Sequence, residues 1–294
     1  MNFSVAQILL GILGLFAVVF GIYFVVDFMK HKDQLEDHNS WGKVLFIGFI
    51  TDFFDTLGIG SFAPTTALAR GMKQVKDQFL PGTLNVSHTI PVVLEAFIFI
   101  AVVEVEPITL GAMLAAATIG AYVGAGFVSS LPEKKVQLAM AIALFITAGL
   151  MLMGQLNLMP GGGDAIGLTG TKLIIAIVAN FILGALMTAG IGLYAPCMAL
   201  VYLLGMSPKV AFPIMMGSCA FLMPAASVKF VKEGAYDRRA SMGITIGGCI
   251  GVYVAVTFVT NMPIAMLTKL VIAVIFYTSY TMFKAASKNQ EQAA

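Results

Sequence analysis

Residues 58–68 of this chain read GIGSFAPTTAL, and residues 190–200 read GIGLYAPCMAL. Seven of the eleven positions are identical at an offset of 132, and Phe62 is replaced by the similar Tyr194. Two glycines followed by a proline interrupt a helix, because glycine adopts conformations that other residues avoid and proline fits the first turn of a new helix. A turn of this kind that occurs twice indicates a duplicated structural unit.

Two further matches extend the duplication beyond these turns. Residues 119–132 and 250–263 share seven of fourteen residues at an offset of 131, and Pro81 matches Pro213 at an offset of 132. The predicted parts are an additional N-terminal helix with a basic loop (residues 1–40), a first repeat (41–156), a glycine-rich linker (157–170) and a second repeat with a C-terminal tail (171–294).

The composition predicts a membrane protein. Hydrophobic residues make up 59% of the 294 residues, and Asp, Glu, Lys and Arg only 11%, whereas soluble domains carry about 25% charged residues. Several apolar runs reach the roughly 20 residues that a helix needs to cross a bilayer. The short alternating segments of a membrane β-barrel are not seen, so the predicted fold class is an all-α polytopic membrane protein.

The distribution of positive charges favours one way of threading the chain through the membrane, because Lys and Arg concentrate in cytoplasmic loops. If each GIG segment belongs to an ordinary crossing, the cytoplasmic loops hold 10 of the 17 Lys and Arg residues, and if each is a re-entrant hairpin they hold 14. We therefore predict about seven full crossings plus two re-entrant broken-helix hairpins, with the N-terminus outside and the C-terminus cytoplasmic. Each repeat then crosses three times, which makes the two repeats inverted, as in many secondary transporters.

The two turns are the predicted substrate site. A half-helix that begins near the membrane centre points free backbone N–H groups and a partial positive charge into the protein, which suits an anion. The alternative is a helix kink that only eases packing, and the duplication of the motif counts against it. The predicted substrate-binding residues are Gly58, Gly60, Ser61, Phe62, Pro64, Thr65, Thr66, Gly190, Gly192, Tyr194, Pro196 and Cys197.

Polar residues inside the apolar runs form the second candidate group, because ionisable groups in a membrane usually face a functional cavity. Asp52 and Asp55 are three residues apart and share a helical face, as do Asn85 and His88, with Glu95 further along. We predict that these five residues couple transport to protons or another cation. The alternative is that they are structural polar groups, or groups that lie near the membrane surface.

The duplicated GIG turn resembles the motif of the sulfite exporter TauE/SafE family of membrane permeases. The length, the two-repeat layout and the number of crossings are also similar, so the resemblance covers essentially the whole chain. It implies transport of small sulfur-containing anions such as sulfite or an organosulfonate, in the cytoplasmic membrane of bacteria.

The predicted function is therefore a secondary transporter, or permease, for a small anion, coupled to a proton or cation gradient in the cell membrane. Two alternatives stay open: a transporter of a cation or neutral solute bound by Asp52, Asp55 and Glu95, and a passive channel. We expect no enzymatic activity, cofactor or metal site, since signatures for nucleotide binding, metalloproteases and hydrolases are missing.

The expected partners are the anionic solute and the lipid bilayer, and the net charge of +2 is too small to indicate nucleic acid. A homo-oligomer is left open. Arg70, Lys73 and Lys76 follow the first hairpin. They are interpreted as orienting the chain, with the collection of cytoplasmic anions as a second interpretation.

Overall fold

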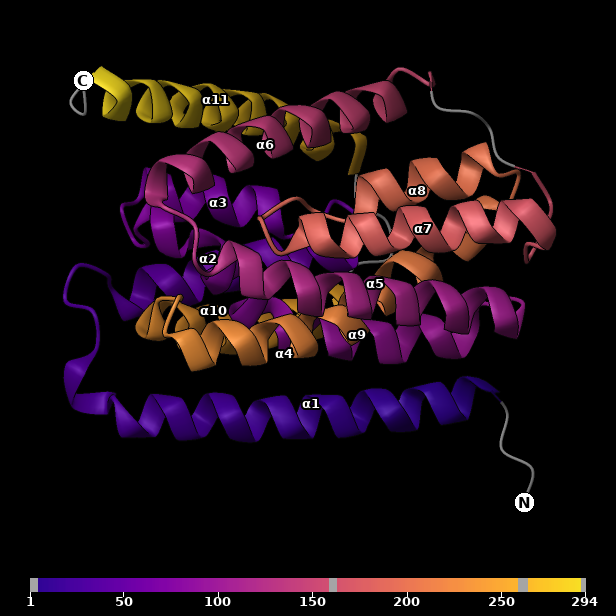
Figure 1. Cartoon of the computed structure of the whole chain (residues 1–294), viewed down its shortest axis with the longest axis horizontal. Coiled ribbons are helices and arrows are strands. Elements are labelled where there is room, and N and C mark those ends of the chain that lie inside the picture. The colour runs from indigo at the N-terminus through magenta and orange to yellow at the C-terminus, as the bar shows by residue number, and fades with distance from the viewer. Residues whose placement is uncertain (1–4, 159–162, 259–263, 292–294) are drawn as a thin grey trace.

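The structure, a computed structural model, describes residues 5–158, 163–258 and 264–291. This part of the chain is built from helices that run nearly parallel in a bundle (Figure 1). Its α-helices are α1 (Val5–Lys30), α2 (Trp41–Thr56), α3 (Phe62–Gly71), α4 (Leu80–Val102), α5 (Pro107–Val128), α6 (Glu133–Gln155), α7 (Gly170–Met187), α8 (Tyr194–Leu203), α9 (Pro208–Glu233), α10 (Arg238–Phe258) and α11 (Ile264–Glu291), with short 3-10 helices at η1 (Lys32–Gln34) and η2 (Asp77–Phe79).

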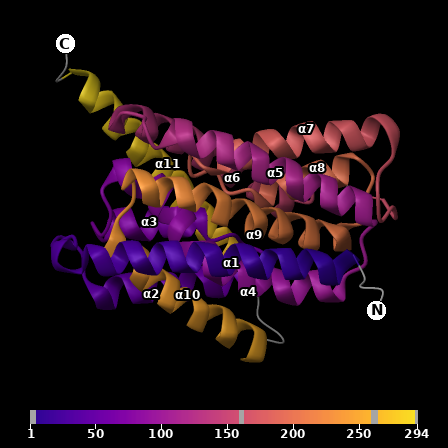
Figure 2. The same cartoon turned by 60° about the horizontal axis from the view of Figure 1, so that its bottom comes forward.

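Six helices in the described part are long and apolar enough to cross a membrane: α1, α5, α6, α7, α9 and α10. Among these six, α9 is the most buried and α1 is the most exposed. Figure 2 shows α1 lying along the outside of the bundle in front of α9. The exposed side chains of α1 include Ile8, Leu15 and Val18, as expected for a helix that faces lipid. The fold class is confirmed as a polytopic helical membrane protein, while the number of crossings stays a prediction.

Each GIG segment turns the chain back toward the end from which it came, as predicted. In the first hairpin, the backbone N–H of Ser40, just before α2, donates to Gln74 Oε1, just after α3, at 2.8 Å. In the second hairpin, Lys172 Nζ at the start of α7 donates to the carbonyl oxygen of Leu204 at the end of α8, at 3.0 Å. The helices α2 and α3 have 16 and 10 residues, about 24 and 15 Å, which is short of a bilayer core of about 30 Å.

The two hairpins occupy opposite ends of the bundle. In Figures 1 and 2, α2 and α3 lie toward the left end and α7 and α8 toward the right end. The first residues of α1 and the last residues of α11 also lie at opposite ends. This arrangement is the inverted topology that the count of positive charges predicted.

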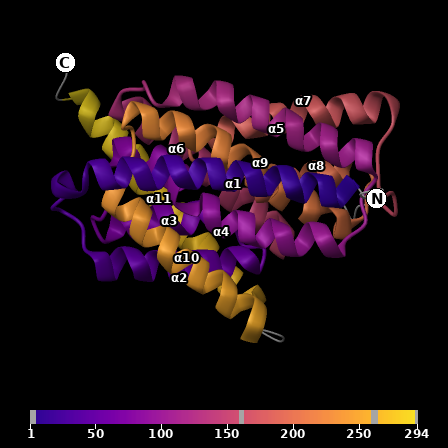
Figure 3. The ribbon, with the colours of Figure 1, turned by 90° about the horizontal axis from the view of Figure 1, so that it is seen from below.

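The helices of one repeat pack against those of the other in a reciprocal way. Helix α2 packs against α10, and α7 packs against α5, on opposite sides of the central helices α4 and α9 in Figure 3. A Cβ atom added at Gly120 of α5 would overlap the carbonyl oxygen of Phe181 in α7, and one added at Gly251 of α10 would overlap that of Phe49 in α2. These four positions correspond at offsets of 131 and 132, so each close contact has its counterpart across the bundle.

A buried polar cluster fixes the end of the bundle that holds the first hairpin. Asp237, just before α10, accepts hydrogen bonds through Oδ1 from Asn39 Nδ2 and from the Ala240 N–H, each at 2.8 Å. His38 Nε2 lies 3.3 Å from its other oxygen. Burial, helped by the nearby charge of Glu36, raises the pKa of Asp237 to about 7. The cluster ties the loop between α1 and α2 to the turn between α9 and α10.

Candidate functional site

The two GIG turns meet around a small cavity in the interior of the bundle. The first turn contributes Gly60, Ser61 and Phe62, and the second contributes Gly192 and Tyr194. Their closeness is direct, because a Cβ atom added at Gly60 would lie 4.0 Å from Tyr194 Cδ2. The rest of the lining comes from Asp55, Ile59, Ala63, Val92, Thr147, Met187, Leu193, Ala195 and Cys219.

The cavity has a volume of about 30 Å³. That is room for about two water molecules, since one needs roughly 10–15 Å³ measured in this way. A solute larger than this can enter only if the walls move apart. The two turns come from different repeats, so movement of one repeat against the other changes the size of this cavity.

Three of the four motif glycines are required by the backbone. Gly58, Gly60 and Gly190 have φ angles of +87°, +90° and +94°, in the left-handed region where other residues are strained. Gly192 is not among the residues with positive φ, and a Cβ atom there would meet nothing within 4 Å. The backbone conformation therefore requires glycine at one position of the second turn and at two positions of the first.

Both half-helices begin at the cavity. The N-cap residues are Ser61 for α3 and Leu193 for α8, and neither helix has a side-chain cap. Pro64 and Pro196 stand in the first turns, as predicted from the sequence, and neither has an N–H group. The residues that carry the remaining N–H groups of these turns line the cavity, so the positive ends of two helix dipoles lie at it.

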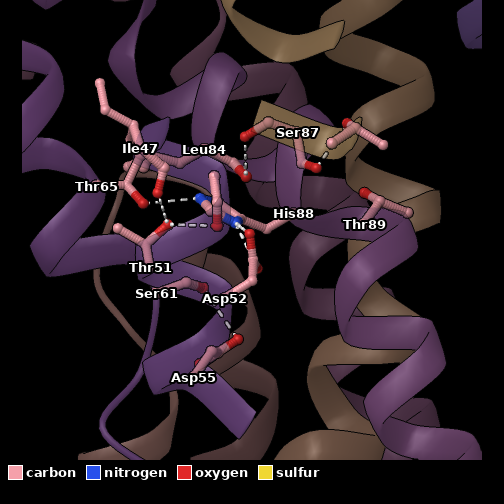
Figure 4. Close-up of polar contacts among 12 residues, drawn as sticks. Ile47, Thr51, Asp52, Asp55, Ser61, Thr65, Leu84, Ser87, His88 and Thr89 are labelled. Atoms are coloured by element: carbon pink, nitrogen blue, oxygen red, sulfur yellow. Dashed lines mark hydrogen bonds and ion pairs between the residues drawn. The ribbon is translucent and has the colours of Figure 1, made fainter. Parts of the chain in front are cut away.

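A chain of hydrogen bonds links α3, the half-helix that follows the first GIG turn, to α4 and α2. His88 Nδ1 lies 2.8 Å from Asp52 Oδ1, and His88 Nε2 lies 2.9 Å from Thr65 Oγ1. Figure 4 shows the imidazole between the carboxyl group and the hydroxyl group. At most 1% of each of these three residues is exposed. Because each ring nitrogen has its own partner, the imidazole can pass a proton between Asp52 on α2 and Thr65 on α3.

The other two acidic residues contact the two turns directly. Asp55 Oδ2 accepts a hydrogen bond from Ser61 Oγ at 3.1 Å. Glu95 of α4 accepts from Thr56 Oγ1 at 2.8 Å and from the Tyr194 hydroxyl at 3.2 Å. Tyr194 thus connects the turn of the second repeat to an acidic residue of the first.

Two polar atoms that line the cavity are unsatisfied. Within the described residues, Asp55 Oδ1 and Thr147 Oγ1 are buried and have no hydrogen-bond partner. Buried polar atoms are rarely left without a partner, because the loss of hydration costs about 1–3 kcal/mol. Both residues are among those that line the cavity. One carboxylate oxygen and one hydroxyl group at the cavity therefore have unused hydrogen-bonding capacity.

The other predicted site residues lie around the cavity without lining it. A Cβ atom at Gly58 would contact the ring of Phe212, and one at Gly190 would overlap the side chain of Met140. The Thr66 hydroxyl donates to the carbonyl oxygen of Phe62, and the Asn85 amide donates to that of Pro81 within its own helix. Cys197 is buried. The prediction that these five residues take part in binding or coupling stays a prediction.

The structure also brings to the site residues that were not predicted from the sequence. Thr147 reaches the cavity from α6, and Val92, Met187 and Cys219 complete its walls. Thr56 holds Glu95 in place. A signal existed only for Thr147 and Thr56, which are hydroxyl residues within apolar runs.

A family model described as Sulfite exporter TauE/SafE matches residues 1–151, which is just over half of the chain. This range contains the first GIG turn and all five predicted coupling residues, whereas the second turn lies beyond it. No match was found among curated proteins or among solved structures.

Proposed function

The chain belongs to the sulfite exporter TauE/SafE family, and we propose that it is a secondary transporter that carries a small sulfur-containing oxyanion, such as sulfite or an organosulfonate, together with a proton. The observation that carries this proposal is the cavity between the two inverted turns. It is lined by the first residues of two uncapped half-helices and by two unsatisfied polar atoms, Asp55 Oδ1 and Thr147 Oγ1.

Recognition of the anion follows from the backbone. Sulfite and sulfonates present three oxygen acceptors, and the first turns of α3 and α8 offer N–H donors from two directions. The Thr147 hydroxyl adds a donor from a third helix. Among the residues that the structure describes, no Lys or Arg lines this cavity, so the helix ends supply the favourable potential for the anion.

Coupling to protons follows from the position of Asp55. An anion in the cavity lies against this carboxyl group, and two negative charges in a buried site repel each other strongly. A protonated Asp55 instead donates a hydrogen bond to the anion through its unsatisfied oxygen. The anion therefore binds with the proton and leaves with it, which is the behaviour of a symporter.

The Asp52–His88–Thr65 chain gives the proton a route. It is buried between α2, α3 and α4 and ends on Thr65, one helical turn beyond Ser61, the partner of Asp55. The proposed cycle moves one repeat against the other around the fixed cavity, so that it opens to each side in turn.

Transport of a cation bound by Asp52, Asp55 and Glu95 fits the contacts less well. Asp52 is occupied by His88, and Glu95 by Thr56 and Tyr194, which leaves one free carboxylate oxygen for a cation. Within the described residues there is also no group of three or more His, Cys, Asp and Glu side chains that could hold a metal ion. A passive channel is disfavoured by the small volume of the cavity.

The test is uptake of labelled sulfite and sulfoacetate into proteoliposomes, with and without an imposed pH gradient. We expect saturable flux that accumulates the anion on the alkaline side, and no such flux in protein-free vesicles. Flux of either anion that never saturates and never runs uphill would instead support a channel.

A further inference from the structure

A second, larger cavity lies at the other end of α3. It has a volume of about 710 Å³ and is lined by the end of α3, the segment between α3 and η2, and part of α11. Ligand-binding clefts of roughly 300–1,000 Å³ are typical for small molecules. Four basic residues line it: His38, Arg70, Lys73 and Lys76.

Lys73 stands where the backbone favours glycine. Its φ angle is +56°, in the left-handed region that few residues other than glycine adopt without strain. The corresponding residue of the second repeat, at an offset of 132, is Gly205, with a φ angle of +84°.

The two turns are otherwise built alike. The N–H of Lys73 donates to the carbonyl oxygen of Arg70, as that of Gly205 does to Tyr202. The next residue closes each turn with a bond to the residue five positions earlier, from Gln74 to Ala69 and likewise from Met206 to Val201. The same turn therefore forms with glycine in one repeat and with a strained lysine in the other, and the lysine is the one that lines a cavity.

The charge in this cavity is not cancelled by its own acidic residue. Arg70 is neutralised by Asp77, through Nε to Oδ1 at 2.9 Å and Nη2 to Oδ2 at 3.1 Å, and it also donates to Thr281. Lys73 and Lys76 are exposed, and neither forms an ion pair with any residue that the structure describes. The cavity thus keeps two unpaired ammonium groups.

The second repeat has no such charge at the corresponding positions. Lys76 corresponds to Pro208, Arg70 to Tyr202 and Lys73 to Gly205. The equivalent turn of the second repeat therefore carries none of these three charges, although Lys172 Nζ would lie 3.7 Å from a Cβ atom added at Gly205. Helix α3 has ten residues, or about 15 Å, and it joins the basic cavity at its C-terminal end to the central cavity at its N-terminal end.

We propose that this basic cavity, formed around Lys73 and Lys76, is a second binding site for the small oxyanion, on the path between the aqueous phase and the central cavity. It raises the local concentration of the anion at this one face of the membrane, as charged clefts do for their ligands. The identity of the ligand as the transported solute rests on the function proposed above, whereas binding of a small oxyanion at this place does not.

Binding is tested without transport. The purified protein in detergent is treated with an amine-reactive acylating reagent, and mass spectrometry follows the rate of modification of Lys73, Lys76 and Lys43. Lys43 is an exposed lysine of α2 that does not line the cavity. We expect methanesulfonate to slow modification of Lys73 and Lys76 several-fold and leave Lys43 unchanged. The neutral molecule of the same shape, dimethyl sulfone, should protect none of them.

Equal rates with and without methanesulfonate would overturn the proposal. Protection by the anionic lipid phosphatidylglycerol but not by methanesulfonate would also overturn it, because the cavity would then hold a lipid headgroup. If Lys73 and Lys76 are protected but no sulfur anion is transported, the second site stands and the proposed function fails.

The role in transport is tested with Lys73→Gly combined with Lys76→Gln. Glycine keeps the turn, since Gly205 forms the same turn in the second repeat. We expect KM for sulfite at this face to rise roughly tenfold with little change in maximal rate, and the dependence of KM on ionic strength to become weaker. Lys43→Gln is the matched control and should change neither. An unchanged KM in a double variant that transports normally would show that the basic cavity does not lie on the path of the anion.

Discussion

Substitution of Asp55 by Asn removes one titrating proton and little else. Asn has the same shape as Asp, and its amide can still contact Ser61, which bonds Asp55 Oδ2 at 3.1 Å. The cavity of about 30 Å³ places a bound anion within roughly 5 Å of this side chain. At an effective dielectric constant of about 20, two unit charges at that distance repel by about 3 kcal/mol. An ionised Asp55 would thus weaken binding more than a hundredfold.

The assay is accumulation of labelled sulfite in proteoliposomes with the membrane potential clamped at zero. One pH unit is worth about 1.4 kcal/mol, so at zero membrane potential a carrier that moves one proton with each anion concentrates the anion about tenfold. We expect this ratio for the unmodified protein. Asp55→Asn should still exchange labelled for unlabelled sulfite, but its accumulation ratio should fall to one.

A matched control is Asp33→Asn, which removes an exposed carboxyl group from η1 and should leave the ratio unchanged. If Asp55→Asn accumulates sulfite as well as the unmodified protein does, Asp55 does not carry the coupled proton and the mechanism is wrong. If the variant loses exchange as well as accumulation while remaining folded, Asp55 acts in binding and not in coupling.

Three further outcomes are expected from substitutions measured by thermal unfolding in detergent. Gly58→Ala forces a Cβ atom onto a backbone with a φ angle of +87° and should lower the free energy of unfolding by about 1–2 kcal/mol. Gly192→Ala should change stability little, and an equal loss in both variants would show that the φ angle is not the cause. His88→Ala leaves the buried carboxyl group of Asp52 without its partner and should lower the free energy of unfolding by about 3–5 kcal/mol. An unchanged melting temperature would show that the pair does not stabilise the fold. Burial raises the pKa of Asp237 to about 7 in the folded protein, above about 3.9 in the unfolded chain. Between these two values the folded protein keeps a proton that the unfolded chain has lost, so the free energy of unfolding should fall as pH rises from about 4 through about 7. Asp237→Asn should remove this pH dependence, and an unchanged profile would show that other groups cause it.

The repeat made the most informative parts of the fold predictable. Two copies of one turn, together with the distribution of Lys and Arg, were enough to expect inverted hairpins, because a helix break and a charge bias are local properties of the sequence. The reciprocal contacts Gly120–Phe181 and Gly251–Phe49 could not be predicted from the sequence. An offset between repeats says which residues are equivalent, but not which helices touch.

The site could be predicted only in part for the same reason. Asp52 and His88 were found because ionisable residues stand out in apolar runs. Thr147 was missed because a single hydroxyl group in α6 is compatible with ordinary packing, and only the approach of α6 to the two turns gives it a role. The contact of Tyr194 with Glu95 joins the two repeats across 99 positions of sequence, which no local pattern reveals.

Crystals soaked with selenite test most directly whether the anion binds between the two turns. Selenite has the shape and charge of sulfite, and its selenium atom can be located by anomalous diffraction; it should first be shown to compete with sulfite for uptake. We expect a selenium peak in the central cavity, placed so that the selenite oxygens lie within hydrogen-bond distance of Thr147 and of the first turns of α3 and α8. If selenite competes for uptake but its peak lies elsewhere in the bundle, the two turns are not the binding site.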